Sequence, residues 1–90
     1  PEVLRDLALV VSRDVSAELM EGAIREKGVE LSNVRLFDLY EGKGVPEGSR
    51  SLAWSLSFQS SDRTLTDEEV DSNMAAIVKA LEKEFGAKLR

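Results

Sequence analysis

The chain has 90 residues, of which 42% are hydrophobic and 32% charged, and its formal net charge is −5. This length and composition indicate one globular domain with a single modest core, and they exclude a collagenous or disordered chain. No apolar run approaches the ~18 residues of a transmembrane helix, so we expect no membrane partner. Cys and His are both absent, which excludes thiol chemistry and removes the usual zinc ligand and the commonest general base.

The acidic residues are distributed unevenly along the chain. The segments 16–30 and 64–85, which we predict to be helical, hold ten of the 17 acidic residues but only four of the 12 basic ones. The acidic total disfavours nucleic acid as a partner, but the remainder is close to neutral and can face RNA without strong repulsion. We expect no DNA partner. The chain starts at Pro1 without a signal-peptide pattern. We therefore expect a fragment of a longer, cytoplasmic protein.

The first half of the chain predicts a strand, a helix and a second strand. The apolar, β-branched run 6–11 is typical of a strand. Ser16 is a plausible N-cap for a helix that ends near Lys27, and Met20 and Ile24 recur at helical spacing. Gly28 is expected to supply the left-handed residue that ends this helix. A second strand is predicted over 31–40, followed by a glycine-rich hairpin loop over 41–50.

The second half contains the clearest signals. Residues 51–59 alternate strictly between apolar and small polar side chains, which predicts a strand with one buried face, carrying Trp54, and one open face. Thr66 followed by Glu69 predicts a capping box at the start of a helix, and an apolar stripe continues to Phe85. A short last strand is expected over 87–90.

The predicted order of elements is strand, helix, strand, strand, helix, strand. Right-handed crossovers fold this order into an α+β, ferredoxin-like βαββαβ sandwich, with a four-stranded antiparallel sheet in the order 4-1-3-2. Both helices then lie on one face of the sheet. The other face is left open, and we expect any binding site to lie on it.

The residues of this domain give little support to an enzymatic function. Nucleophile–base arrangements built on His or Cys are impossible here, and no glycine-rich phosphate-binding motif opens a helix. The acidic run that starts at Asp67 has a structural explanation, because carboxylates stabilise a helix N-terminus. We therefore expect no catalytic residue, no metal site and no cofactor in the chain.

The open face suits a nucleobase better than a substrate. A carboxylate can accept two hydrogen bonds from the Watson–Crick edge of guanine, an aromatic ring can stack on a base, and small residues let the base approach the sheet. Strand parity over 31–40 predicts that Phe37 and Leu39 enter the core. The same parity places the following residues on the open face, together with Ala8 and Ser51: Val34, Leu36, Asp38 and Tyr40.

Five motifs in order carry a family resemblance. They are Pro1-x-x-x-Arg5-Asp6-Leu7-Ala8, Leu36-Phe37-Asp38-Leu39-Tyr40-Glu41-Gly42, Ser51-Leu52-Ala53, Asp62 to Val70 and Leu89-Arg90. In order and spacing they resemble the ferredoxin-fold anticodon-binding domain at the C-terminus of bacterial phenylalanyl-tRNA synthetase β subunits. The resemblance covers essentially the whole chain. Trp54 and Leu39 are mild departures from the family pattern.

The resemblance implies a binding function and its residues. Family members bind the anticodon of tRNA(Phe) on the open sheet face and read its first base, a guanine. Carried over by position, Ala8, Asp38 and Ser51 match the guanine site and Tyr40 lies beside it, while Arg5 and Arg90 match arginines near that site. The resemblance also implies a parent α₂β₂ assembly in which the α subunit holds the catalytic site for ATP, with magnesium, and phenylalanine.

Two other functions remain open from the residues alone. One is a module of the same fold that senses a small molecule, although such modules often carry a Gly-containing turn after the first strand and the turn 12–16 has none. The other is a protein-interaction domain that uses the sheet or its edge. An RNA-recognition motif fits less well, because its third strand presents aromatic residues outward.

Overall fold

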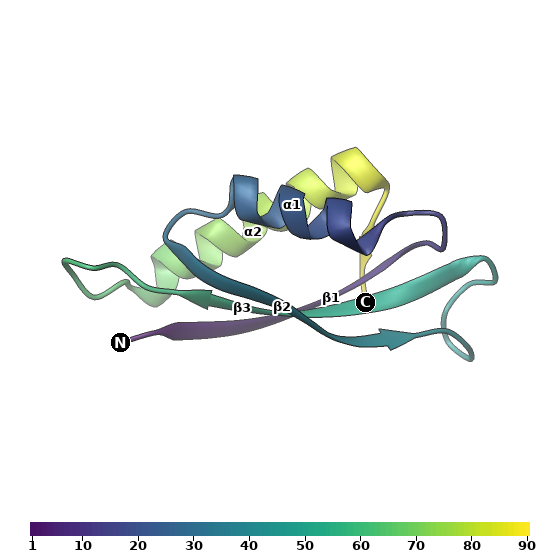
Figure 1. Cartoon of the computed structure of the whole chain (residues 1–90), viewed down its shortest axis with the longest axis horizontal. Helices are drawn as coiled ribbons and strands as arrows, with labels where there is room; N and C mark the ends of the chain where they lie inside the picture. The colour runs from purple at the N-terminus through teal and green to yellow at the C-terminus, as the bar shows by residue number, and fades with distance from the viewer.

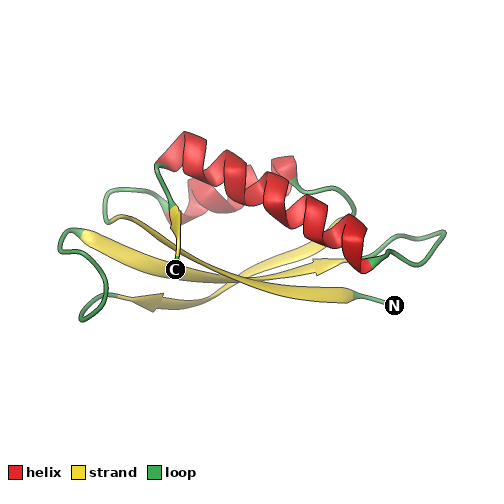
Figure 2. Cartoon of the chain, turned by 180° about the vertical axis from the view of Figure 1, so that it is seen from behind, coloured by secondary structure: helices red, strands yellow, loops and turns green.

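The computed structural model describes all of residues 1–90, as one sheet with two helices on the same face (Figures 1 and 2). The sheet order is β2-β3-β1-β4 and every neighbouring pair is antiparallel, which confirms the predicted ferredoxin-like sandwich and strand order. Neither helix is long and apolar enough to span a bilayer. The elements are β1 (Val3–Ser12), α1 (Ala17–Lys27), β2 (Leu31–Tyr40), β3 (Ser49–Phe58), α2 (Asp67–Phe85) and β4 (Lys88–Leu89).

The core lies between the sheet and the two helices. Trp54 of β3 is fully buried there, as its alternation predicted, and Leu52, Leu56 and Phe58 of the same strand are buried beside it. Met20 and Ile24 of α1 are fully buried against the same cluster, and α2 adds an apolar stripe at helical spacing. The buried residues of α2 are Val70, Ile77 and Leu81. The core therefore occupies one face of the sheet only.

The helix starts follow their predicted caps, with one difference. The Ser16 hydroxyl accepts from the Leu19 N–H and the Thr66 hydroxyl accepts from the Glu69 N–H at 3.1 Å. The Glu69 carboxylate, however, accepts from Arg63, so only the Thr66 half of the capping box is formed. The cap itself still satisfies one N–H of the first turn of α2.

Gly28 does not adopt the predicted left-handed conformation. Its φ is −69°, and the residue with positive φ in this connection is Glu30 at 58°. A Cβ at position 28 would lie 2.9 Å from the Leu31 side chain. The glycine is therefore needed for close packing against β2 and not for a special φ. Gly86, by contrast, ends α2 in the left-handed conformation, with φ 69°.

The single parity predicted for β2 is wrong, because a bulge interrupts the strand between Leu36 and Asp38. Before the bulge, Val34 pairs with Leu56 and Leu36 with Trp54, so both face the helices. Phe37 is 45% exposed instead of buried. An extra residue in one strand reverses the parity that follows it, which is why residues on both sides of the bulge could not be placed from one alternation.

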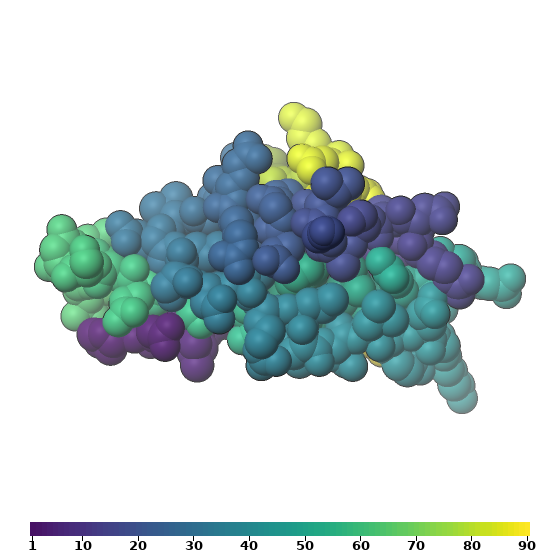
Figure 3. Space-filling view, viewed as in Figure 1, coloured from purple at the N-terminus to yellow at the C-terminus, as the bar shows by residue number.

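After the bulge, the predicted parity holds. Asp38 pairs with Ala53 and Tyr40 with Ser51, both on the open face, while Leu39 pairs with the core residue Leu52. Leu39 is nevertheless 47% exposed, because β2 is an edge strand. In the space-filling view, β2 is exposed along the front of the molecule below α1 (Figure 3).

Candidate nucleic-acid interface

Three residues form a row across the middle of the open face. Asp38 of β2 lies opposite Ala53 of β3, and Ala53 lies opposite Ala8 of β1. Residues directly opposite one another in an antiparallel sheet project from the same face, so the Asp38 carboxylate stands at one end of a floor of two alanines. Asp38 is exposed, and its carboxylate makes no ion pair or side-chain hydrogen bond within the chain. Its oxygens are therefore free to accept from a ligand.

The next row contains Tyr40, Ser51 and Val10. Ser51 pairs with Tyr40 on one side and with Val10 on the other, so it is a diagonal neighbour of Asp38. The structure thus brings Ala8, Asp38, Tyr40 and Ser51 together on one face within two adjacent rows. These are four of the six site residues predicted from the sequence.

The ring of Tyr40 is held in place by the loop that follows β2. Its hydroxyl donates to the Lys43 carbonyl oxygen at 2.9 Å. Gly42 has φ 141°, and a Cβ at that position would lie 3.2 Å from the same hydroxyl. Glycine is therefore required both for the turn and for the close approach of the ring. With its hydroxyl engaged by the loop, Tyr40 offers a fixed aromatic face for stacking.

Arg90, a fifth predicted residue, reaches the same place from the opposite edge of the sheet. Its backbone N–H donates to the Ala8 carbonyl oxygen at 3.0 Å, which extends the pairing of β4 by one residue. Its guanidinium carbon lies 4.9 Å from the centre of the Tyr40 ring, within the range of a cation–π contact. Since β1 and β3 separate β4 from β2, this contact bridges the open face over the small residues.

The bridge accounts for the burial of Ser51. Ser51 is only 3% exposed, although no helix covers this face. Tyr40 stands directly opposite it, and the contact between the Tyr40 ring and the Arg90 guanidinium lies above the strands that separate β2 from β4. The Arg90 side chain thus shields the small residues of the open face from solvent. A base that stacks on Tyr40 can displace this side chain or stack beside it.

Arg5, the sixth predicted residue, lies on the wrong face for this site. It pairs with the core residue Leu56, and its guanidinium bonds Asp67 and Asp71 of α2, each at 3.3 Å. The hydrogen bond to Asp67, with that to Asp71, raises the pKa of Arg5 further above its ordinary value. The resemblance placed Arg5 near the site, but Arg5 lies three residues before Ala8 in an unbroken strand, and this odd spacing puts the two side chains on opposite faces.

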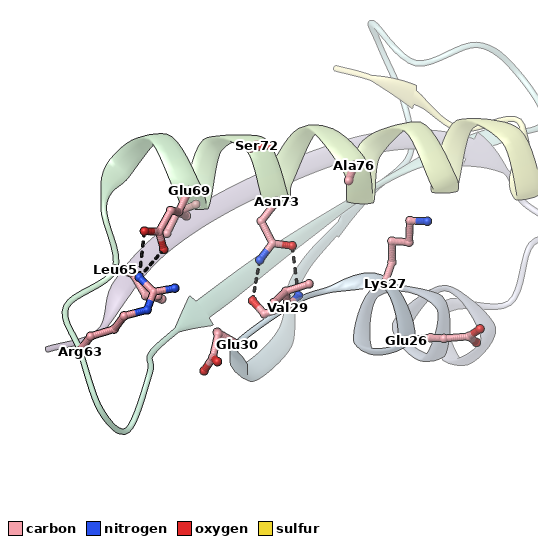
Figure 4. A pocket seen from close by; sticks show the side chains of 11 residues that line it. Glu26, Lys27, Val29, Glu30, Arg63, Leu65, Glu69, Ser72, Asn73 and Ala76 are labelled. Carbon is pink, nitrogen blue, oxygen red and sulfur yellow. Dashed lines mark hydrogen bonds and ion pairs between the residues drawn. The ribbon is translucent and has the colours of Figure 1, made fainter.

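A shallow hollow between the helices, on the opposite side of the molecule, is lined by side chains that bond one another or the neighbouring backbone (Figure 4). There the Asn73 side chain bonds both the N–H and the carbonyl oxygen of Val29, which holds the α1–β2 connection against α2. Arg63 donates to both oxygens of Glu69 at 2.8 Å, and this pairing raises the pKa of Arg63. These side chains serve the packing of the helices.

Two basic residues of the open face were missed by sequence reasoning. Arg35 pairs with Ser55, and Lys88 pairs with Val10, so both project on the same face as Asp38. Neither is part of any of the five ion pairs in the chain. Lys88 could have been found from the pairing of β4, but Arg35 precedes the bulge and its face could not be predicted.

The geometry favours recognition of a base over a chemical reaction. A carboxylate with free oxygens can accept from two adjacent donors, and the Watson–Crick edge of guanine presents such a pair. The alanine floor leaves room for a flat ring, the fixed Tyr40 ring offers a stacking face, and Arg90 adds positive charge that suits a phosphate backbone.

Comparison with known proteins agrees with this reading. Residues 1–90 match the family described as the ferredoxin-fold anticodon binding domain. The chain is 53% identical to the phenylalanine–tRNA ligase beta subunit of Moorella thermoacetica and 48% identical to that of Geobacillus kaustophilus, over 100% of its own length and 11% of each relative. The corresponding subunit of Pseudomonas savastanoi is 48% identical over 12% of its length.

The chain therefore spans about a ninth of the length of the curated relatives it matches. The family match covers the whole chain, and the ferredoxin fold that it names agrees with the observed strand order. The chain belongs to the family of ferredoxin-fold anticodon-binding domains.

Proposed function

We propose that this chain is the tRNA anticodon-binding domain of a phenylalanine–tRNA ligase β subunit and that its open face receives the anticodon of tRNA(Phe). The observation that carries the proposal is the row Asp38–Ala53–Ala8, with the fixed ring of Tyr40 beside it on a face that no helix covers. The relatives are named as subunits of this ligase, which supports the choice of tRNA.

In this proposal Asp38 reads the first anticodon base. Its two oxygens accept from the ring N–H and the exocyclic amine of guanine, a pattern that no other standard base presents. Ala8 and Ser51 line the floor, Tyr40 stacks, and Arg90 lies beside the base. Arg5 is left out, because its guanidinium is engaged with α2 on the other face.

The larger protein supplies the rest of the activity. We propose that the domain operates in a cytoplasmic α₂β₂ enzyme, in which the α subunit uses ATP and magnesium to activate phenylalanine. The support is the naming of the relatives and their greater length. This chain would then contribute to the choice of tRNA and not to the chemical step.

The test is the substitution Asp38→Ala in the complete enzyme. We expect tRNA(Phe) binding to weaken by about 1–3 kcal/mol, the discrimination that a good bidentate base contact provides, while phenylalanine activation is unchanged. Asp38→Asn should be almost as damaging, because its amide places donors against guanine donors. The loss should shrink when the first anticodon base is no longer guanine.

Asp6→Ala is the matched control, because Asp6 is an exposed carboxylate one row away on the same face. Removing a negative charge near RNA should leave affinity unchanged or improve it. Equal losses for Asp38→Ala with guanine and with another base would contradict the proposal, since Asp38 would then act on the structure of the sheet.

A further inference from the structure

The open face has a second aromatic ring, that of Phe37, at the bulge in β2. Phe37 is the extra residue between Leu36 and Asp38, and it has no partner on β3. Its ring is 45% exposed, although phenylalanine is among the residues most often buried. Because Leu36 faces the helices, the alternation before the bulge turns Phe37 toward the open face, and the bulge then lets Asp38 project from that face as well.

The position of Arg35 shows that the Phe37 ring lies on the open face. It pairs with Ser55 on the open face, and its guanidinium carbon lies 5.9 Å from the centre of the Phe37 ring. Arg35 is exposed and takes part in none of the chain's ion pairs. A free cation and an exposed ring therefore adjoin each other directly beside Asp38.

We infer that Phe37 and Arg35 form a second nucleotide subsite, which stacks the base next to the guanine read by Asp38. The inference rests on the proposed function. Single-stranded RNA is held by aromatic rings on which successive bases stack and by cations that follow the backbone, and this pair offers one of each. Phe37 and Asp38 are consecutive, with Cα atoms ~3.8 Å apart, so we expect the base on Phe37 to neighbour the base on Asp38 in the RNA chain.

The subsite differs from the guanine site in what it can recognise. Phe37 has no polar atom, and Arg35 donates to phosphate or to many base edges, so stacking there tolerates any base. It should add affinity without adding discrimination. Its contribution can thus be separated from that of Asp38 in the same measurement.

The experiment measures the affinity of the complete enzyme for tRNA(Phe) with Phe37→Ala and Arg35→Gln. We expect Phe37→Ala to weaken binding about tenfold, and by the same factor whether or not the first anticodon base is guanine. Phe37→Trp should retain the affinity, because it keeps the aromatic face. Leu39→Ala is the matched control, since Leu39 is an equally exposed apolar residue of β2 on the helix side, and it should change nothing.

A second arm identifies the nucleotide. When one neighbour of the first anticodon base is made abasic, the effect of Phe37→Ala should disappear, because the stacked base is already missing. The inference would be overturned if Phe37→Ala still weakened binding in both modified tRNAs, the one abasic before the first anticodon base and the one abasic after it. Equal losses for Phe37→Ala and Leu39→Ala would also overturn it. If Phe37→Ala leaves the tRNA affinity unchanged while Asp38→Ala still shows its guanine-dependent loss, only the second subsite is contradicted. If neither variant changes the tRNA affinity, the proposed function is contradicted as well.

Discussion

The two faces of the sheet use their charged side chains differently. On the helix side, arginines are engaged by carboxylates of the same domain, as in the pairs Arg5–Asp71, Arg25–Glu21 and Arg63–Glu69. On the open face, Arg35 and Asp38 form no ion pair, and the remaining charged residues there are also without one. Those residues are Asp6, Lys88 and Arg90.

This difference separates stability from binding within one small domain. Surface ion pairs contribute little individually, but a guanidinium held by two carboxylates is less available to RNA phosphates. Unpaired charges are retained on the face where the small residues and the aromatic rings gather. The acidic surplus of the chain lies on the helical segments, and these cover the opposite face from Asp38.

The largest expected effect compares two consecutive residues of β3 that project from opposite faces. Trp54 is fully buried, so Trp54→Ala should destabilise the domain by about 3–5 kcal/mol through the cavity that it leaves. Ser55 belongs to the open face, and Ser55→Ala should stay within about 0.5 kcal/mol. Urea denaturation of both variants checks this, and similar losses would mean that the open face is part of the core.

A smaller effect is expected on the helix side at the start of α2. Thr66→Ala removes the hydroxyl that accepts from the Glu69 N–H and should cost about 1 kcal/mol of stability. Affinity for tRNA(Phe) should not change, because the cap lies away from the open face. An unchanged denaturation midpoint would show that the capping hydrogen bond does not contribute in solution.

Replacing Arg5 is expected to leave tRNA binding unchanged. Arg5→Gln breaks the contacts with Asp67 and Asp71 but leaves the open face intact, so tRNA affinity in the complete enzyme should remain within about twofold, a change below 0.5 kcal/mol. Binding measurements on Arg5→Gln beside Arg35→Gln test the division between the faces. A larger loss for Arg5→Gln would return Arg5 to the RNA site, where the family resemblance had put it.

The fold was predictable because several local signals agreed. The alternation in β3, the cap at Thr66 and the apolar stripe of α2 each specify one element, and the right-handed crossover then leaves few topologies. The row containing Ala8 and Asp38 was also predicted on the correct face.

Two of the incorrect predictions, those for β2 and for Gly28, have a common physical origin in contacts between elements. The bulge at Phe37 depends on the pairing of β2 with β3 and reverses the side-chain parity, which no count of apolar residues along the strand could show. Gly28 was assigned to a backbone conformation, whereas its role is to make room for Leu31. Arg5 was assigned by resemblance, although its odd spacing from Ala8 along β1 puts the two side chains on opposite faces.

The central claim is that RNA binds the uncovered sheet face and not the helices. The direct measurement is a titration of the 90-residue chain with the anticodon stem-loop of tRNA(Phe), followed by backbone amide NMR. The account predicts that the largest shifts cluster at Ala8, Asp38 and Ala53 and in the loop after Tyr40, while the amides of α1 and α2 stay unchanged. Shifts concentrated on the two helices, with the Asp38 row unmoved, would contradict it.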